Sequence, residues 1–349
     1  RVLIIRLRSL GDTVLATPSL RALRDWRPDL RLSILLYPRF APILEGNSNL
    51  EEVLELDAEG AGAPLRIART VSALRQRRFA ACFNLHGGTL SALLTQLSGA
   101  PHRVGFQNFR FPWAYTHRVA LRDIFGHDRI HAVENQIALF YAAGLPRKEI
   151  PALEVFPQAA ARDAVAQKLA QRGLPAAAPY AVFHPIANFF TKEWPFERYA
   201  ALARALEQEH GLAPVFIAGE GESAKLDAVA RAFGKASIRL EGLPLPELVA
   251  LLERAALFVG NDSGPAHIAG ALNRPLVVLF GSSNSTVWRP WRASHEIVQN
   301  SYACNPCRGD RCYAFAQPEC ILSITLEQVR AAVERVLAPA SPGRVVQIR

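Results

Sequence analysis

Short apolar runs alternate with amphipathic segments along most of the chain. In the first half, the apolar runs that we expect to form buried strands are residues 2–6, 32–37, 52–56 and 79–85. The segments in which apolar residues recur at helical spacing are residues 14–26, 65–78, 89–97 and 132–143. Gly11 and Asp12 fall between a strand and a helix, and we expect them in a loop. Strands that alternate with helices in this way predict a doubly wound α/β domain.

The same alternation begins again in the second half. Strands are expected at residues 180–183, 214–218, 237–240, 255–259 and 276–280, with helices at residues 196–209, 223–233 and 246–253. Proline and glycine gather around a helical segment between the halves, which indicates a hinge. We therefore predict a first domain at 1–155, a linker at 156–179 and a second domain at 180–349. Residues 107–129 fit neither pattern and are expected to be irregular.

Composition and charge narrow the class of protein. The chain has 349 residues and a net charge of +9, and half of its residues are hydrophobic. No apolar run approaches the roughly 18 to 20 residues that span a bilayer, and no secretory leader is evident, so we expect a cytoplasmic protein. The positive charge favours a partner with several anionic groups. Nucleic acid is disfavoured, because no helix-turn-helix, zinc finger or aromatic RNA-binding motif organises the charge.

The stretch VGNDSGPAHIAGALNRPLVVLFG at residues 259–281 predicts a strand, a tight turn, a helix and a second strand. Asp262 or Ser263 is suited to cap the helix, and Pro265 suits its first turn. The free amides of such a helix start form a site for a phosphate. The simpler interpretation, that the turn is only a well-made cap, stays open.

Three other turns carry polar side chains where predicted strands end. Asp12 follows the first strand, Lys192 precedes a helix in the second half, and Glu222 stands in the glycine-rich turn AGEGES. A lysine before a helix start suits a diphosphate leaving group, and Glu222 could bind a ribose hydroxyl or cap its helix. The first turn holds one glycine where a dinucleotide fingerprint needs three, so a nicotinamide dehydrogenase is disfavoured.

Four stretches in this order, RVLIIRLRSLGDTVLATPSLRALR, TKEWPFERYAAL, AGEGES and the 259–281 stretch, resemble the family-nine glycosyltransferases. That family includes the ADP-heptose heptosyltransferases of lipopolysaccharide inner-core synthesis. The resemblance implies the α/β GT-B fold, in which two Rossmann-like domains face each other across a cleft. It also implies that the first domain binds the acceptor, that the second binds the nucleotide sugar, and that transfer inverts the sugar without a catalytic metal.

The resemblance also implies roles for individual residues. The family's general base falls on Asp12, and its diphosphate-balancing lysine falls on Lys192. The further donor-binding residues that it implies are Thr191, Glu222, Asp262, Ser263, Gly264 and His267. Candidates for the acceptor side are Arg8, His86 and Arg103. The implied donor is ADP-heptose and the implied acceptor is the lipid A-core oligosaccharide. The arginine-rich segments 66–78 and 103–129 suit a phosphorylated acceptor embedded in a membrane, and we hypothesise peripheral docking on the inner leaflet.

Other functions remain open at this point. A GT-B sugar-nucleotide epimerase would share the fold, but it needs additional acid and base carboxylates and gives Asp12 no purpose. A heptosyltransferase acting on a protein acceptor would share the donor half. A non-catalytic glycan- or nucleotide-binding module is disfavoured by the presence of both Asp12 and Lys192.

Four of the five cysteines lie in one predicted loop, residues 302–321. Cys304, Cys307, Cys312 and Cys320 have the ligand type and spacing of a tetrathiolate zinc or iron site. Free thiols are the alternative, since disulfides are disfavoured in a cytoplasmic protein. Such a metal would hold the loop in place without taking part in catalysis, and no cofactor is expected for the chemistry. Cys82, within a predicted strand, is expected to be buried and inert.

Overall fold

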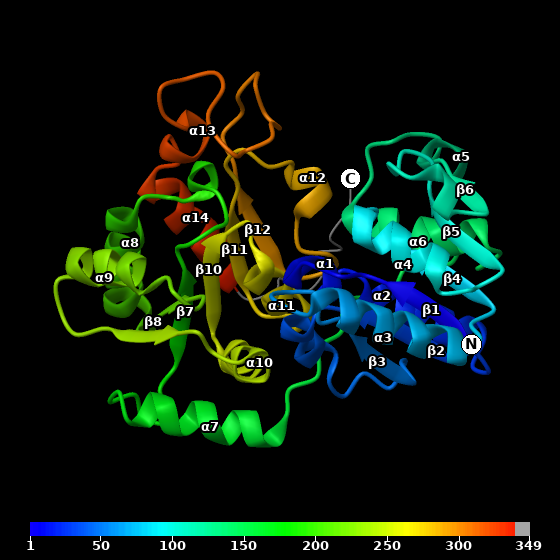
Figure 1. The fold of residues 1–349 in the computed structure, drawn as a ribbon. Helices are drawn as coiled ribbons and strands as arrows, with labels where there is room; N and C mark the ends of the chain where they lie inside the picture. Colours follow the sequence, from blue (N-terminus) through cyan, green and yellow to red (C-terminus); the bar gives the residue numbers. More distant parts are fainter. Residues whose placement is uncertain (339–349) are drawn as a thin grey trace.

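The computed structural model describes residues 1–338, which form two α/β halves, each built around a six-stranded sheet (Figure 1). The first sheet has the order β3-β2-β1-β4-β5-β6, with every pair of neighbours parallel. Its strands are β1 Val2–Ile5, β2 Leu32–Leu36, β3 Glu52–Glu55, β4 Ala81–Asn84, β5 His102–Phe106 and β6 His117–Val119. The helices of this half are α1 Leu10–Val14, α2 Thr17–Trp26, α3 Ala63–Gln76, α4 Thr89–Leu97, α5 Leu121–Phe125 and α6 Ala132–Ala142, with 3-10 turns η1 Pro38–Leu44 and η2 Pro112–Ala114.

The second sheet has the order β12-β11-β10-β7-β8-β9 and is also parallel throughout. Its strands are β7 Tyr180–His184, β8 Ala213–Ala218, β9 Ile238–Glu241, β10 Leu257–Asn261, β11 Leu276–Leu279 and β12 His295–Val298. The helices are α7 Ala159–Ala170, α8 Phe196–His210, α9 Ser223–Phe233, α10 Leu245–Arg254, α11 Gly264–Ala271, α12 Ser285–Trp288, α13 Glu319–Leu322 and α14 Leu326–Leu337, with the 3-10 turn η3 Phe190–Lys192.

The two sheets have the same topology when each is numbered from its own first strand. In each, the chain runs outward from a central strand and then returns to build the other side, so the strand order reverses next to β1 and next to β7. Ligands of open parallel sheets bind beyond the carboxyl ends of the strands at such switch points. The expected two-domain α/β class is therefore confirmed, and the topology places a binding site at the end of β1 and at the end of β7.

Two predictions for individual segments were wrong. Residues 107–129 are not irregular throughout, because they contain η2, β6 and α5. These elements are too short for a periodic pattern, and β6 exposes two of its three residues. Gly11 and Asp12 lie within α1 and not in a loop, since Ser9 and Asp12 form a capping box that starts a helix there. The predicted second domain extends into residues 339–349, which lie outside the described part of the chain.

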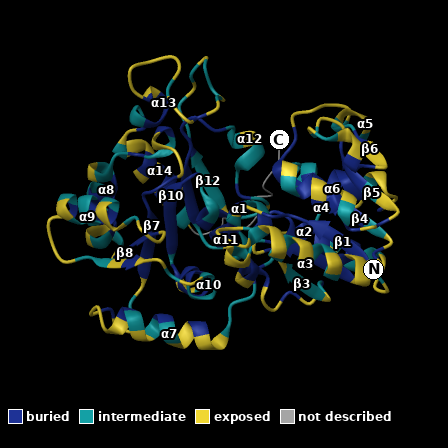
Figure 2. Cartoon of the chain, in the orientation of Figure 1, coloured by how far each residue is buried: buried dark blue, intermediate teal, exposed yellow. Residues whose placement is uncertain are grey.

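Burial follows the sheets, as the dark strands in Figure 2 show. All residues of β1, β2, β7, β10 and β11 are buried, which explains why these strands are continuous apolar runs without alternation. Helices α3 and α7 are mostly exposed on their outer faces. Helix α7 packs against α10, where Arg162 and Glu253 form a bidentate ion pair at 2.7 Å.

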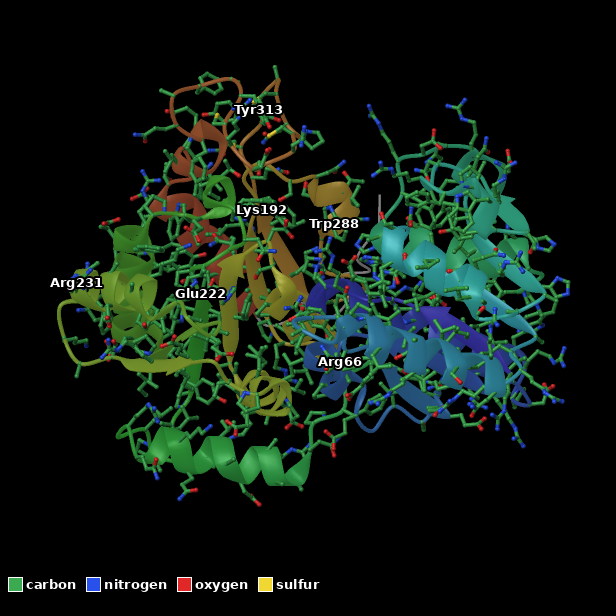
Figure 3. The ribbon with its side chains drawn as sticks, viewed as in Figure 1. Arg66, Lys192, Glu222, Arg231, Trp288 and Tyr313 are labelled. Carbon is green, nitrogen blue, oxygen red and sulfur yellow. The ribbon has the colours of Figure 1, made fainter. Side chains whose placement is uncertain are left out.

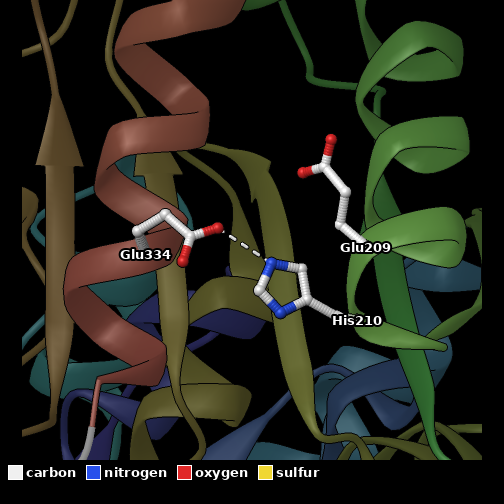
Figure 4. A group of neighbouring side chains, drawn as sticks. All are labelled: Glu209, His210 and Glu334. Atoms are coloured by element: carbon white, nitrogen blue, oxygen red, sulfur yellow. Dashed lines mark hydrogen bonds and ion pairs between the residues drawn. The ribbon is translucent and has the colours of Figure 1, made fainter.

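Helices α8 and α14 cover one face of the second sheet and are tied together by polar pairs (Figure 4). The His210 Nε2 atom lies 2.8 Å from Glu334 Oε1, and Glu209 pairs with Arg330 at 2.6 Å. The three groups Glu209, His210 and Glu334 lie close enough to share a cation. Because each already has a protein partner, we interpret the cluster as a helix-to-helix tie.

Asn261, at the end of β10, joins three segments inside the second half. Its Oδ1 accepts from the Trp194 backbone N–H at 3.2 Å and from the Tyr199 hydroxyl at 3.0 Å, and its Nδ2 donates to the Pro185 carbonyl at 2.8 Å. All of these groups lie in the dry interior, where an unpaired polar atom is costly. Asn261 therefore fixes the loop after β7 to the end of β10.

We expect Asn261→Leu to lower the free energy of unfolding by about 3–5 kcal/mol, since it leaves several buried polar groups unpaired at about 1–3 kcal/mol each. Tyr199→Phe, which removes one of these hydrogen bonds, is the matched control and should cost about 1 kcal/mol. Urea unfolding followed by circular dichroism measures both. Equal, small losses for the two variants would contradict this account of Asn261.

Candidate active site

A cavity of about 1070 Å³ lies between the two halves, at the carboxyl ends of β1 and β7. Its first-half wall includes Arg6, Arg8, Asp12, Arg39 and His86. Its second-half wall includes Lys192, Glu222, Asp262, Ser263, Gly264 and Trp288. Figure 3 labels Lys192, Glu222 and Trp288, which come from separate segments of the second half. The cavity thus brings together side chains that are distant in the sequence, and we refer to it as the cleft.

Asp12 stands at the start of α1 with both carboxylate oxygens engaged. Its Oδ2 accepts from the Ser9 hydroxyl at 2.9 Å and from the Ser9 backbone N–H at 3.3 Å, while Oδ1 forms an ion pair with Arg6. The side chain is 19% exposed, on the cleft side. Asp12 therefore completes the capping box at the start of α1 and also faces the cleft.

Lys192 forms an ion pair on the opposite wall. Its Nζ lies 2.9 Å from Asp262 Oδ2, and the Ser283 hydroxyl donates to the same oxygen at 2.6 Å. The side chains of Lys192 and Asp262 are 21% and 8% exposed, so water screens this pair only partly. An anion entering the cleft would meet a lysine that is already held in position by a buried carboxylate.

The start of α11 also lines the cleft. Ser263 is the N-cap residue, but its hydroxyl donates to the Asn261 carbonyl and contacts His184 Nδ1 at 2.9 Å, and does not cap the helix amides. Burial lowers the pKa of His184 to about 4, so this imidazole is neutral at pH 7. The first turn is therefore available to an anion.

Glu222 lines the cleft just before α9, and its Oε2 accepts from the Gly219 backbone N–H at 2.7 Å. Beside it, the cleft wall becomes apolar, formed by Ile217, Leu243, Pro244 and Leu248. Sequence reasoning did not find this apolar wall, because its residues continue the apolar pattern of β8 and α10. An apolar wall with a carboxylate nearby is suited to a nucleobase.

His86 is an acceptor-side candidate that lines the cleft from the turn after β4. Burial, together with the positive charges of Arg6 and Arg8, lowers the pKa of His86 to about 4. The imidazole is therefore neutral near pH 7 and can act as a hydrogen-bond partner. Arg8 and Arg39 supply positive charge on the same wall.

Three residues predicted for the site are not among the described residues that line the cleft. Thr191 is buried and donates to the Gly309 carbonyl, away from the cleft. His267 is buried against α1, where a methyl group on Gly11 would lie 2.8 Å from its Cδ2. Arg103 binds the carbonyls of Ala100 and Ala114. Thr191 and His267 thus pack behind cleft residues, and Arg103 supports the loop before β6.

Cys304, Cys307, Cys312 and Cys320 line one small cavity of about 20 Å³, and all four are free thiols. Thr191 and Ser282 line the same cavity and lie 3.1 Å apart through their hydroxyl oxygens. Their chain neighbours Lys192 and Ser283 instead bind Asp262. Residues 191–192 therefore contribute one side chain to each cavity, and residues 282–283 connect the cysteine cavity to Asp262 of the cleft wall.

Cys82 is fully buried, as expected. Burial raises the pKa of its thiol to about 12, so it stays protonated at neutral pH. Burial also raises the pKa of Cys320. Burial thus disfavours the thiolate form of Cys320, and the bond from a metal ion to the thiolate would have to offset this loss of solvation.

Comparison with known proteins places this cleft in a family context. The model of Glycosyltransferase family 9 (heptosyltransferase) matches residues 67–315. Lipopolysaccharide heptosyltransferase 3 from Escherichia coli is 28% identical over 353 residues, which cover 97% of this chain and 99% of that protein.

Two solved structures share the two-domain fold. The family 9 glycosyl transferase from Veillonella parvula has a TM-score of 0.86 at 24% identity, covering 97% of each chain. E. coli ADP-heptose LPS heptosyltransferase II has a TM-score of 0.80 at 22% identity, covering 97% of this chain and 98% of that one. The expected GT-B class is thus confirmed at the level of the fold.

Proposed function

Because the chain belongs to glycosyltransferase family 9, we propose that it transfers a heptose from ADP-heptose to a lipopolysaccharide-core acceptor. The observation that carries this proposal is the cleft itself, in which Asp12 faces Lys192 and the start of α11 from the opposite half. A base on one wall and an anion site on the other are what a single-displacement sugar transfer requires. The names of the similar proteins, which refer to lipopolysaccharide and ADP-heptose, support the choice of substrates.

The donor would occupy the second half. Its adenine would lie on the apolar wall formed by Ile217, Leu243 and Leu248, and its ribose would approach Glu222. The diphosphate would then reach Lys192 and the first turn of α11, which provide positive charge. Lys192 would then contact the incoming phosphate as well as Asp262, so donor binding would give this lysine a second ionic partner.

The acceptor would occupy the first half. A hydroxyl of the acceptor would donate to Asp12, which takes the proton as the oxygen attacks the anomeric carbon. The bond between that carbon and the diphosphate oxygen breaks at the same time, and ADP leaves with the electron pair. Attack from the face opposite to the leaving group inverts the anomeric configuration. Arg8 and Arg39 suit the acidic groups of a core oligosaccharide.

The positive charge of Lys192 and of α11 takes the place that a divalent cation holds in other phosphate chemistry, and we propose that transfer needs no catalytic metal. A mass-spectrometric screen of donors and acceptors tests the function. We expect one heptose to be added to a core oligosaccharide and ADP to be released only when acceptor is present. Conversion of a nucleotide sugar without acceptor would favour an epimerase, and addition only to a protein would overturn the proposed acceptor.

We also propose that the four cysteines of the loop bind a structural zinc or iron ion. The support is chemical: four thiols line one small cavity, and soft thiolates are the ligands that these ions prefer. No three of the four sulfurs lie within 4.8 Å of one another in the described part of the chain, so an ion would have to draw the loop together. The ion would hold the segment with Thr191 and therefore the position of Lys192, without taking part in the reaction.

Elemental analysis of anaerobically prepared protein is expected to find about one zinc or iron per chain, from the four-thiolate coordination of such ions. Cys304→Ser/Cys312→Ser should lose the ion and lower Tm by about 5 °C or more. Cys82→Ala, the control outside the loop, should keep its metal. If the wild-type protein contained no stoichiometric zinc or iron, the proposed metal site would be wrong.

We further propose peripheral docking on the cytoplasmic face of the membrane that carries the acceptor. Within residues 1–338 no helix is long and apolar enough to cross a bilayer. Trp113, next to β6, is 59% exposed, and Arg110 and Arg118 beside it are also exposed. Interfacial tryptophan with flanking arginine favours contact with anionic headgroups.

Co-sedimentation with vesicles containing anionic lipid is expected to exceed that with neutral vesicles and to fall as salt is raised. Trp113→Ala/Arg110→Gln should reduce binding without changing transfer to a soluble acceptor. The exposed pair Arg162 and Glu253 allows a charge-matched control, Arg162→Gln. Binding that is indifferent to lipid charge and to salt would rule out electrostatic docking.

A further inference from the structure

Arg6 is a buried charge at the switch point of the first sheet. It follows β1 directly, is 9% exposed, and lies next to strand residues that are wholly apolar. Its guanidinium forms the ion pair with Asp12 and donates to the carbonyl of Leu85, immediately after β4. Its backbone N–H donates to the Leu35 carbonyl at 3.0 Å. One side chain thus connects the end of β4 with the carboxylate of α1.

The fold alone does not require a charge at this position. Burial lowers the pKa of Arg6, with the Asp12 carboxylate opposing this effect, and the guanidinium stays charged at neutral pH. Its Nε is buried without a hydrogen-bond partner in the described part of the chain. Replacing a buried ion pair by apolar residues is often neutral or stabilising, so a buried arginine is weak evidence for stability. Its position beside Asp12 therefore points to a role in the site.

Arg6 and Ser9 hold the two oxygens of Asp12 from different sides, so they fix the plane of the carboxylate. The other titratable groups around it are His86 after β4 and His267 on α11. Burial lowers the pKa of both imidazoles, so both are neutral near pH 7. Gln136 of α6 approaches Asp12 only at its backbone carbonyl. Arg6 is thus the cation in direct contact with the carboxylate.

We propose that Arg6 is a positioning residue for the transfer, which orients the Asp12 carboxylate toward the acceptor hydroxyl. This inference rests on the proposed role of Asp12 as general base. Because Arg6 holds one carboxylate oxygen and Ser9 holds the other, the carboxylate is kept in one orientation for receiving the proton.

The test compares Arg6→Gln, which removes the charge, with Arg6→Lys, which keeps it. We expect Arg6→Gln to lower kcat at pH 7 by about tenfold to a hundredfold, within the range that positioned acid–base groups contribute. The KM for the acceptor should change by less than about threefold, because Arg6 would act through the carboxylate and not on acceptor binding. Arg6→Lys should restore most of the rate. The Kd for ADP, measured by titration calorimetry, should stay unchanged in both.

Arg21→Gln, an exposed arginine on α2, controls for the change in net charge. A lower kcat in Arg6→Gln that Arg6→Lys does not restore, or a weakened ADP Kd, would assign Arg6 to the fold and overturn the proposal. In an Asp12→Asn background, Arg6→Gln should lower kcat no further, since both residues act on the same step. A further loss of kcat in the double variant would contradict the proposal. If Arg6→Gln does not fold, a wild-type rate from Arg6→Ala or Arg6→Met would contradict it equally.

The outcome is separable from that of the proposed function. If Asp12→Asn were active, Asp12 could not be the general base, and the proposed mechanism would be wrong. If Asp12→Asn were inactive while Arg6→Gln was fully active, only the proposed role of Arg6 would be wrong.

Discussion

Asp12→Asn is expected to lower kcat by about 10²–10⁴-fold, the range for loss of a general base. Asparagine has nearly the same shape and can still accept at the start of α1, so the helix should still form. Arg6 loses its carboxylate partner, so we also expect a lower Tm. The Kd for ADP should not change, since ADP would bind on the opposite wall. Initial rates with saturating donor and acceptor, together with calorimetric ADP titration, measure the two effects separately.

Asp25→Asn on α2 provides a control of the same chemistry, because Asp25 is exposed and, within residues 1–338, forms an ion pair with Arg21 alone. Its rate should equal that of the wild type. If Asp12→Asn kept most of the transfer activity at full acceptor concentration, another group would have to take the proton, and the proposed mechanism would be wrong.

Lys192→Met is expected to lower kcat by about 10²–10³-fold and to weaken ADP binding. The substitution removes the positive charge that would stabilise the leaving diphosphate. It also leaves the Asp262 carboxylate, which is 8% exposed, without its cationic partner. Loss of one partner of a buried pair is costly, so the variant should be less stable as well. Thermal unfolding and ADP titration report these two consequences.

The double variant Lys192→Met/Asp262→Asn separates the effect on stability from the effect on the reaction. It should recover stability, since no buried charge is left unpaired, but it should not recover the transfer rate. Lys235→Met, which affects an exposed pair with Glu207, is the matched control and should leave both unchanged. A double variant that regains the wild-type rate would show that the lysine serves only to neutralise Asp262.

The sequence was most informative where strands end in polar turns. Asp12, Lys192, Glu222 and Asp262 were each predicted from such a turn. Each parallel sheet brings its turns to one edge, and the edges of the two sheets meet at the cleft, so all four residues line it. Their assigned chemical roles remain predictions. What the pattern could not give is the direction of neighbouring side chains: Thr191 and Lys192 are adjacent, yet one lines the cysteine cavity and the other the cleft.

Other features were invisible for a related reason. Arg6 follows four apolar residues and looks like the flank of a strand, because its partners Asp12 and Leu85 are known only from the fold. The apolar wall around Leu243 and Leu248 cannot be told from core by periodicity. Strands β6 and β12 are three and four residues long and carry polar side chains, so no apolar run indicates them.

The two halves also contact each other beside the cleft, which affects how the site assembles. Leu10 of α1 packs on Gly264 of α11. A methyl group added to Gly264 would lie 3.0 Å from the Cδ2 atom of Leu10. The Trp291 indole donates to the Pro151 carbonyl at 3.0 Å, and His131 Nε2 lies 2.7 Å from the Arg289 carbonyl. These contacts hold the carboxyl ends of both sheets together, so Asp12 and Lys192 are presented to a common space.

The central claim is that Asp12 and the Lys192 wall act on one sugar in a single displacement. NMR of the purified product of ADP-heptose and core oligosaccharide tests it most directly. The account predicts one heptose added, with an anomeric configuration opposite to that of the donor. A product that retains the donor configuration, or donor that is consumed with no heptose on the acceptor, would contradict it.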